Sequence, residues 1–209
     1  MDRRSPNSRR PLLALAALTL LAALLAGCGS SSSGTTGARI NYAGLEAAPP
    51  KAAPPLKLKN YKGEPVSLGD YRGKAVLLTF IYTHCPDVCP LIVSHMKTAQ
   101  ALLGHKAKDL QIVAVSTDPR GDTPHTVAAF LKARGMTGKM QYLIGSRPEL
   151  EHVWKAWNIL AKTDKANPNL VEHSAEIYGI GADGKITTLY PANFKPQELV
   201  HDVPLLAQR

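Results

Sequence analysis

Cysteine is scarce in this chain, with three residues in 209. That number is too small for the disulfide framework of many small exported proteins, so the fold must depend on a hydrophobic core. Only 6% of the residues are aromatic, and the excess of Lys and Arg behind the net charge of +9 is scattered along the chain. Without a basic stripe interleaved with aromatic side chains, nucleic-acid binding is not expected. The chain also has no internal repeat.

An apolar run long enough to cross a bilayer is missing as well. Residues 1–10 carry four arginines, and residues 12–26 are apolar apart from one threonine. This run is shorter than the roughly 20 residues of a spanning helix, and a charged start before it indicates a secretory signal. It ends in Leu-Ala-Gly-Cys at Cys28, which resembles the bacterial lipobox. We therefore expect a lipoprotein signal peptide over residues 1–27 and acylation of Cys28.

Acylation of Cys28 would hold the protein to a membrane of the cell envelope by a lipid anchor, with its folded part on the extracytoplasmic side. Residues 29–37 are Ser, Gly and Thr, and residues 47–55 are Ala and Pro with one Lys. The first composition is typical of a flexible tether and the second of a stiffer spacer. We therefore expect a tether over residues 28–55 and one folded domain over residues 56–209, which is long enough to bury a single core.

Strand-like and helix-like segments alternate along the predicted domain. A hairpin of residues 56–58 and 65–68 comes first. The later strands are expected at residues 75–81, 110–116, 140–144, 175–180 and 186–190, and the helices at 91–103, 124–133, 148–157 and 197–206, the last interrupted at Pro204. This order predicts an α/β fold with a central mixed sheet flanked by helices and an N-terminal hairpin extension. Trp154 and Trp157 lie three residues apart and are expected to face the core.

Cys85 and Cys89 lie in the turn between the most apolar strand and the first helix. Their spacing places them about one helical turn apart, with Cβ atoms roughly 5–6 Å from each other if both are helical. The N-terminus of a helix stabilises thiolates, whereas the negative charge of Asp87 in the same loop opposes them. Such a pair is suited either to one metal ion or to a redox-active disulfide.

Two thiolates can hold a soft ion, but a defined site usually has a further donor. Most of the seven histidines are expected at helix ends or on helix surfaces, and the position of His95 directs it away from the thiols. His84 is adjacent to Cys85 and remains a candidate. His173 stands directly before the final hairpin, and in a thioredoxin-like fold that segment packs over the strand-to-helix turn.

Four segments together resemble the Sco/SenC family. Residues 82–90 are Tyr-Thr-His-Cys-Pro-Asp-Val-Cys-Pro, residues 116–119 are Ser-Thr-Asp-Pro, residues 122–124 are Asp-Thr-Pro, and residues 172–174 are Glu-His-Ser. The resemblance extends over residues 56–190, and the nine-residue cysteine segment is specific. It implies a membrane-tethered protein with a thioredoxin-like fold.

The resemblance also implies a function and a ligand set. Cys85, Cys89 and His173 would bind copper as Cu(I) or Cu(II), and the protein would help to assemble the dinuclear copper centre of cytochrome c oxidase subunit II. Other copper chaperones and thiol reductases are further partners to be expected. Two positions depart from the family, since Glu172 replaces a common Asp and Glu176 replaces an aromatic or aliphatic residue.

Two functions remain open at this point. The first is capture and delivery of copper, and the second is thiol-disulfide exchange between the cysteine pair and a partner disulfide. Delivery is favoured because the pair has three intervening residues, one more than in general oxidoreductases, and no dedicated acid/base residue is evident. A copper or redox sensor is a third alternative. Asp118 and Asp122 match the family, but a turn and a helix cap explain both equally well.

Overall fold

The computed structural model describes residues 41–163 and 170–209. The predicted signal peptide, Cys28 and the Ser/Gly tether up to residue 40 lie outside the described residues. Within those two ranges, no helix is long and apolar enough to cross a membrane.

Eight strands form one sheet in the order β1-β10-β9-β4-β5-β6-β2-β3. The strands β4, β5 and β6 are parallel to one another, and the remaining pairs are antiparallel. This mixed sheet confirms the predicted fold class. Its strands are β1 (Leu45–Ala52), β2 (Lys57–Asn60), β3 (Pro65–Ser67), β4 (Ala75–Ile81), β5 (Leu110–Ser116), β6 (Met140–Ile144), β9 (Ile177–Ile180) and β10 (Lys185–Tyr190). A separate two-stranded sheet pairs β7 (Ala161–Thr163) with β8 (Val171–His173).

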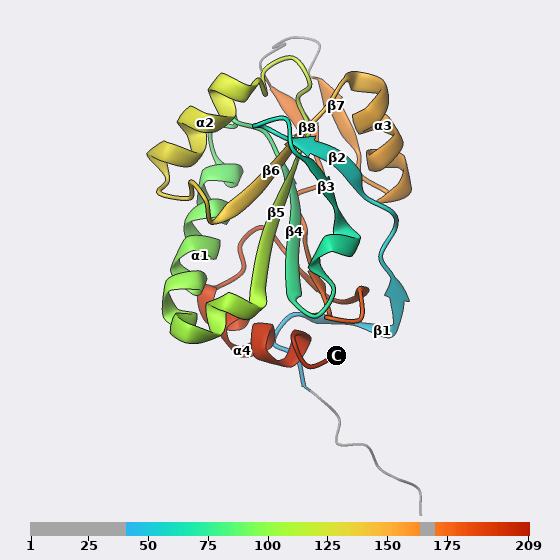
Figure 1. Cartoon of the computed structure of the whole chain (residues 1–209), viewed down its shortest axis with the longest axis vertical. Helices are drawn as coiled ribbons and strands as arrows, with labels where there is room; N and C mark the ends of the chain where they lie inside the picture. The colour runs from blue at the N-terminus through green and yellow to red at the C-terminus, as the bar shows by residue number, and fades with distance from the viewer. Residues whose placement is uncertain (1–40, 164–169) are drawn as a thin grey trace, which may run out of the picture. The chain divides into compact units, whose positions relative to one another are not determined.

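Helices cover both faces of the sheet (Figure 1). They are α1 (Val88–Leu103), α2 (Pro124–Ala133), α3 (Arg147–Ala156) and α4 (Pro196–Leu206), with the 3-10 helices η1 (Leu68–Tyr71) and η2 (Gly104–Asp109). In β4, Leu77 and Ile81 pack under α1, α2 and α4, while Leu78 and Phe80 pack under α3. Every residue of β4 is therefore buried, as its unbroken apolar sequence predicts.

The tryptophans are core residues, as predicted. Trp154 and Trp157 are 5% and 3% exposed, and the Trp154 indole N–H donates to the backbone oxygen of Ser116 over 3.0 Å. The predicted break at Pro204 is wrong, because α4 continues to Leu206. A proline there removes one hydrogen bond near the end of the helix, where unpaired backbone groups are normal.

The N-terminal boundary requires correction. The spacer predicted up to residue 55 contains β1, which pairs with β10 at the edge of the large sheet. Composition misleads here because proline is excluded from central strands but tolerated on an edge strand. The predicted hairpin forms between β2 and β3, and it extends the large sheet because β2 also pairs with β6.

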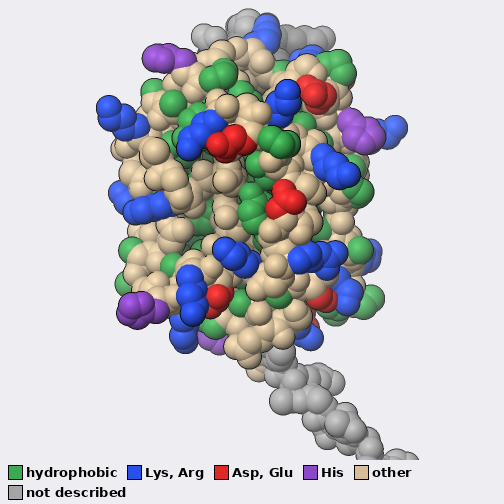
Figure 2. Space-filling view, viewed as in Figure 1, with side chains coloured by type: hydrophobic (Ala, Val, Ile, Leu, Met, Phe, Trp, Pro, Cys, Tyr) green, Lys and Arg blue, Asp and Glu red, His purple; other side chains and the backbone are tan. Residues whose placement is uncertain are grey.

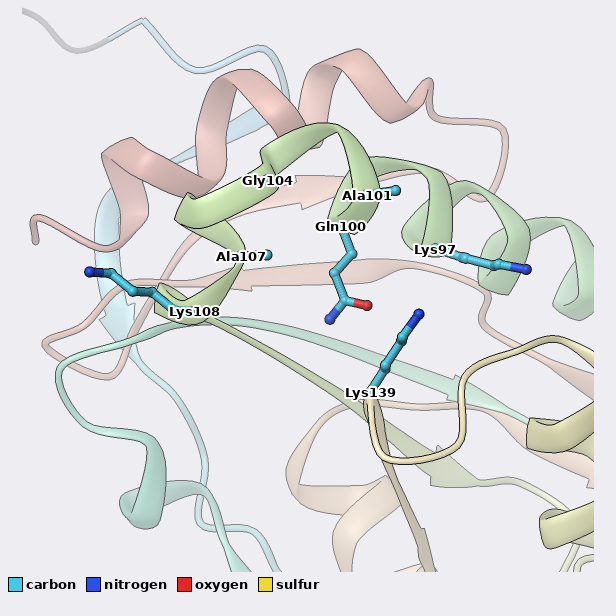
Figure 3. Close-up of a pocket in the computed structure, with 7 residues that line it drawn as sticks. All are labelled: Lys97, Gln100, Ala101, Gly104, Ala107, Lys108 and Lys139. Atoms are coloured by element: carbon cyan, nitrogen blue, oxygen red, sulfur yellow. The ribbon is translucent and has the colours of Figure 1, made fainter.

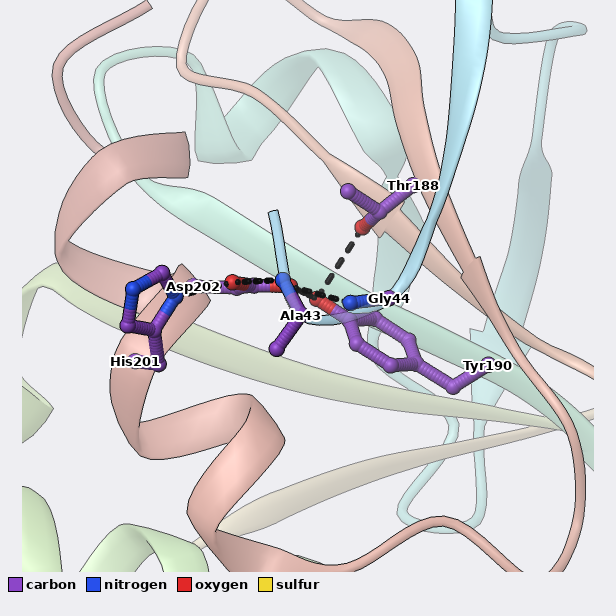
Figure 4. Close-up of polar contacts among 6 residues, drawn as sticks. All are labelled: Ala43, Gly44, Thr188, Tyr190, His201 and Asp202. Atoms are coloured by element: carbon purple, nitrogen blue, oxygen red, sulfur yellow. Dashed lines mark hydrogen bonds and ion pairs between the residues drawn. The ribbon is translucent and has the colours of Figure 1, made fainter. Parts of the chain in front are cut away.

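A buried carboxylate fastens the segment before β1 to α4 (Figure 4). Asp202 is fully buried and accepts the backbone N–H groups of Ala43 and Gly44 at 2.8 and 2.9 Å. The hydroxyl of Tyr190 donates to the same carboxylate over 2.8 Å, and Nδ1 of His201 lies 2.6 Å from it. Residues 43 and 44 are thus part of the folded domain, at a fixed point beside α4.

Replacement of Asp202 by Ala should lower the free energy of unfolding by about 3 kcal/mol, because two backbone N–H groups and a tyrosine hydroxyl lose their buried acceptor. Urea denaturation measures this difference. Gln197→Ala, an exposed change on the same helix, serves as the control and should stay within about 0.5 kcal/mol of the wild type. Equal stability of Asp202→Ala and the wild type would show that the fastening contributes nothing.

Candidate functional site

The two cysteines lie where β4 passes into α1. The helix starts at Val88, one turn earlier than predicted, so Cys89 and Pro90 fall in its first turn. The N-cap residue Asp87 makes no side-chain capping hydrogen bond, and the Cys89 N–H instead donates to Sγ of Cys85 over 3.3 Å. One sulfur therefore satisfies a backbone donor that a cap would otherwise bind. Both cysteines are free and buried, with exposures of 7% and 0%.

His173 comes to this turn from the end of β8. Its Nε2 lies 3.6 Å from Sγ of Cys89, and its Nδ1 lies 2.9 Å from the backbone oxygen of Ser174. A carbonyl only accepts, so Nδ1 carries a proton and donates in this hydrogen bond, and Nε2 is the ring nitrogen that faces the sulfur. The sequence places His173 in a loop, whereas it ends a short strand paired with Ala161.

Tyr82, which precedes the cysteine turn, contacts both His173 and Val171 of β8. Its ring meets the imidazole of His173 edge-on, with centroids 5.6 Å apart, and its hydroxyl accepts the N–H of Val171 over 3.4 Å. Tyr82 is 3% exposed. This role of Tyr82 is not evident from the sequence, where the signal is an aromatic residue directly after the buried strand and ahead of the cysteines.

The two sulfurs differ in acidity. A hydrogen bond from the Cys89 thiol holds the pKa of Cys85 well below its usual range, and His173 acts in the same direction against the effect of burial. The pKa of Cys89 is raised, first because its proton is shared with the Cys85 thiolate and second because the group is buried. Cys85 is therefore the more acidic of the two thiols.

A buried carboxylate ties together the strand ends beneath the thiols. Asp122 accepts the N–H and hydroxyl of Thr83 at 2.8 and 2.7 Å, the hydroxyl of Ser116 at 2.6 Å and that of Tyr142 at 2.8 Å. These donors follow or belong to β4, β5 and β6. Burial raises the pKa of Asp122 despite the hydrogen bonds. The N-cap residue of α2 is Thr123, so Asp122 is not a helix cap and instead joins residues that follow or belong to three strands.

The other candidate residues lie around the site or away from it. His84 is exposed, and its Nδ1 contacts the hydroxyl of Thr83 at 3.1 Å. Gly121, in the loop that carries Asp118, lies close to His84. A Cβ added at Gly121 would be 3.1 Å from Nδ1 of His84. His95 turns away as predicted, with Nδ1 2.8 Å from the backbone oxygen of Phe194.

The two positions that depart from the family, Glu172 and Glu176, are both exposed. In the two described parts of the chain, no group of three or more His, Cys, Asp or Glu side chains has the arrangement of an assembled metal site. What the structure brings together is two sulfurs and one imidazole nitrogen, in contact with one another.

Fold and site together define a thioredoxin-like protein with a dithiol at the strand-to-helix turn and a histidine beside it. A family model described as SCO1/SenC matches residues 46–208, so the chain belongs to the SCO1/SenC family. It is 28% identical over 154 residues to the mouse (Mus musculus) mitochondrial SCO1 homolog, in a match covering 71% of this chain and 54% of the mouse protein. The chain thus spans about half the length of the mitochondrial relatives that it matches.

Solved structures agree with this family. The structure of Bradyrhizobium japonicum ScoI with copper bound is 27% identical and has a TM-score of 0.66, covering 74% of this chain and 99% of that one. BsSco, described as having a disulfide switch and as a member of the Sco family of cytochrome c oxidase assembly proteins, is 26% identical with a TM-score of 0.64, covering 80% of this chain and 98% of that one.

Alkylation by iodoacetamide should distinguish the two thiols. Because the pKa of Cys85 is lowered, its reactivity should persist from neutral to mildly acid pH and fall only as the pH drops toward the lowered pKa, while protonated Cys89 stays unreactive. In His173→Ala the fall should move to higher pH, since one interaction that lowers the pKa of Cys85 is lost. Peptide mapping by mass spectrometry gives both rates. A common midpoint for both thiols near the ordinary value of about 8.5 would contradict the asymmetry.

Proposed function

We propose that this protein captures copper through Cys85, Cys89 and His173 and delivers it during assembly of cytochrome c oxidase. The observation that carries the proposal is the approach of His173 Nε2 to within 3.6 Å of Cys89 Sγ, from a strand far away in the sequence. Metal–sulfur and metal–nitrogen bonds of roughly 2.3 and 2.1 Å let one ion bond to both of these atoms. Small movements of the side chains would close the site around it.

The donor set favours copper. Thiolates and an imidazole suit Cu(I), and the same three donors accept Cu(II) with an added water or weak ligand. A closed structural zinc site requires four protein ligands, and this site offers three. Cys85 is the more acidic thiol, and binding of the ion through both sulfurs requires that Cys89 also release its proton. A site with three donors leaves a position at which an acceptor's ligand attacks during exchange.

The acceptor that we propose is cytochrome c oxidase subunit II, at its dinuclear copper centre. The similarity to BsSco, a member of a family of cytochrome c oxidase assembly proteins, and to a ScoI structure with copper bound supports this choice. Other copper chaperones or thiol reductases would load the site or reduce the pair. The exposed His84 beside the thiols is available to such a partner.

Thiol-disulfide exchange is the second candidate function, and the unequal acidity of the sulfurs favours it. The Cys85 thiolate would attack a partner disulfide and release one partner thiolate, forming a mixed disulfide. Cys89, after losing its proton, would then attack Cys85 and release the second partner thiolate. The partner gains two electrons, and a Cys85–Cys89 disulfide remains. Reduction of an acceptor in this way is compatible with subsequent copper loading.

The proposal includes attachment to the membrane. Acylated Cys28, after removal of residues 1–27, would anchor the domain on the extracytoplasmic side of the cell envelope. The sequence around Cys28 supports this attachment.

Anaerobic titration of the reduced protein with Cu(I) tests the ligand set. Cys85→Ser and Cys89→Ser should each abolish stoichiometric binding, because a serine hydroxyl is a hard, weak donor for Cu(I). His173→Ala should weaken Cu(II) binding by about 100-fold or more and change its absorption spectrum, while the cysteines still form a disulfide. His152→Ala, an exposed histidine on α3, is the matched control and should behave as the wild type.

Tight Cu(I) binding by the double cysteine variant would refute the site, and unchanged Cu(II) spectra in His173→Ala would refute the histidine as a ligand. The same variants in cells separate the two functions. If delivery dominates, His173→Ala should lower cytochrome c oxidase activity, and added copper should restore part of it. Full activity with a copper-free His173→Ala protein would favour thiol exchange instead.

The membrane anchor is tested by Cys28→Ser. This variant should not incorporate labelled fatty acid, and on detergent phase partitioning it should be found in the aqueous phase, because no acyl chain can be attached. Cys85→Ser should keep both properties and serves as the control. Undiminished fatty-acid labelling of Cys28→Ser would exclude Cys28 as the lipidation site.

A further inference from the structure

We infer that the domain docks on an anionic phospholipid surface through a lysine-lined depression. The depression lies at the same end of the domain as residues 41–44, which we call the tether root because the proposed tether enters the folded domain there. The inference rests on the proposed membrane attachment and adds to it a specific face and orientation. Its ligand is the phosphate headgroup of anionic lipids. Three observations carry it: the lining of the depression, the fixed position of the tether root, and exposed leucines at the same end of the domain.

The depression has a volume of about 510 Å³ and lies along the C-terminal half of α1, η2 and the start of β6 (Figure 3). Three lysines line it, and the other lining residues are neutral: Lys97, Lys108, Lys139, Gln100, Ala101, Gly104 and Ala107. Figure 3 shows Gln100 and Lys139 projecting into the space between α1 and the strand below it. No carboxylate contributes to the lining.

The lysines around this space keep their charge available. Lys97, Lys108 and Lys139 are exposed, and none of them forms an ion pair with an acidic residue in the described ranges. Elsewhere on the surface basic and acidic side chains are mixed, as Figure 2 shows for one face of the domain. An uncompensated group of lysines attracts phosphate headgroups, and the attraction weakens within about 10 Å at ordinary salt.

The tether root lies at the same end of the domain as the depression. The bonds from Ala43 and Gly44 to Asp202 fix the root on α4, and α4 packs against both α1 and η2. In Figure 1 the blue start of the described chain lies beside α4 at the lower end of the molecule. A chain anchored through residues 28–40 therefore brings this end of the domain to the membrane first.

Two exposed leucines favour a lipid surface over an acidic protein or a free anion. Leu45 follows the fastened Gly44 and is 72% exposed, and Leu102 in the last turn of α1 is 56% exposed. Apolar side chains next to lysines are typical of segments that rest in the headgroup region. A small anion in solution would gain nothing from them.

Docking in this way orients the thiols. Cys89 is in the first turn of α1, and the rise along the helix puts it about 12 Å from Lys97 at the near end of the depression and about 23 Å from Gly104 at the far end. The thiols and His173 would then face away from the bilayer, toward an acceptor domain that projects from the membrane.

Hydrogen–deuterium exchange of the mature lipidated protein tests the inference. The protein is placed on phosphatidylcholine vesicles with and without phosphatidylglycerol, and exchange of the η2 amides is followed together with acylation of individual lysines by a water-soluble reagent. On the anionic vesicles η2 should exchange more slowly, and Lys97, Lys108 and Lys139 should be protected. The variant K97Q/K108Q/K139Q should lose the η2 protection.

The variant K57Q/K59Q/K62Q removes the same charge from exposed lysines on and after β2 and should keep the protection. Without its acyl chain, the wild-type domain should bind anionic vesicles on the order of 100-fold more tightly than K97Q/K108Q/K139Q, given the contribution of each lysine near such a surface. Three results would each overturn the inference. They are equal loss of the η2 protection in both triple variants, equal exchange on both kinds of vesicle, and the same protection by inorganic phosphate alone.

Flotation with neutral vesicles reports on the anchor separately. A protein that does not float with them lacks the proposed lipid attachment. Protection on anionic vesicles would still support the docking face in that case.

Discussion

The approach of one imidazole to two neighbouring sulfurs is the constraint on which the site depends. His173 is held from three sides: Ser174 binds its Nδ1, Tyr82 contacts its ring and the start of β8, and pairing of β8 with β7 fixes the backbone. The sulfurs are fixed by the start of α1. A chain that failed to position either part would have a dithiol or a histidine, but no common place for a soft ion.

Beneath this site the sheet supplies its own reinforcement. Asp122 joins the ends of β4 and β5 and the side chain of Tyr142 from β6 through four short hydrogen bonds. A buried carboxylate is tolerated only when its oxygens are satisfied, and here each oxygen accepts two donors. The cost of burying Asp122 is thus offset, and the loop that carries the cysteines gains a rigid base.

Much of this could be predicted from the sequence, because the parallel strands and the cysteine segment carry local signals. The bounds of β4, β5 and β6 agree with those predicted from apolar runs. The position of His173 before the final hairpin made it a candidate, and the family resemblance gave it the role of a ligand. Tyr82 and Asp122 were not given their roles, since contacts between residues far apart in sequence leave no local pattern. The edge strand β1 was missed for a different reason: its Ala- and Pro-rich composition is that of a linker, and only its pairing with β10 makes it a strand.

That same composition determines how the sheet ends. A free strand edge is a template on which other chains add strands, and proline cannot donate to such a ladder because it has no N–H. Pro49 and Pro50 stand in the middle of β1, where its register with β10 shifts between Glu46 and Lys51. The terminal strand therefore resists edge-to-edge association, which keeps one copy of the domain from extending the sheet of another.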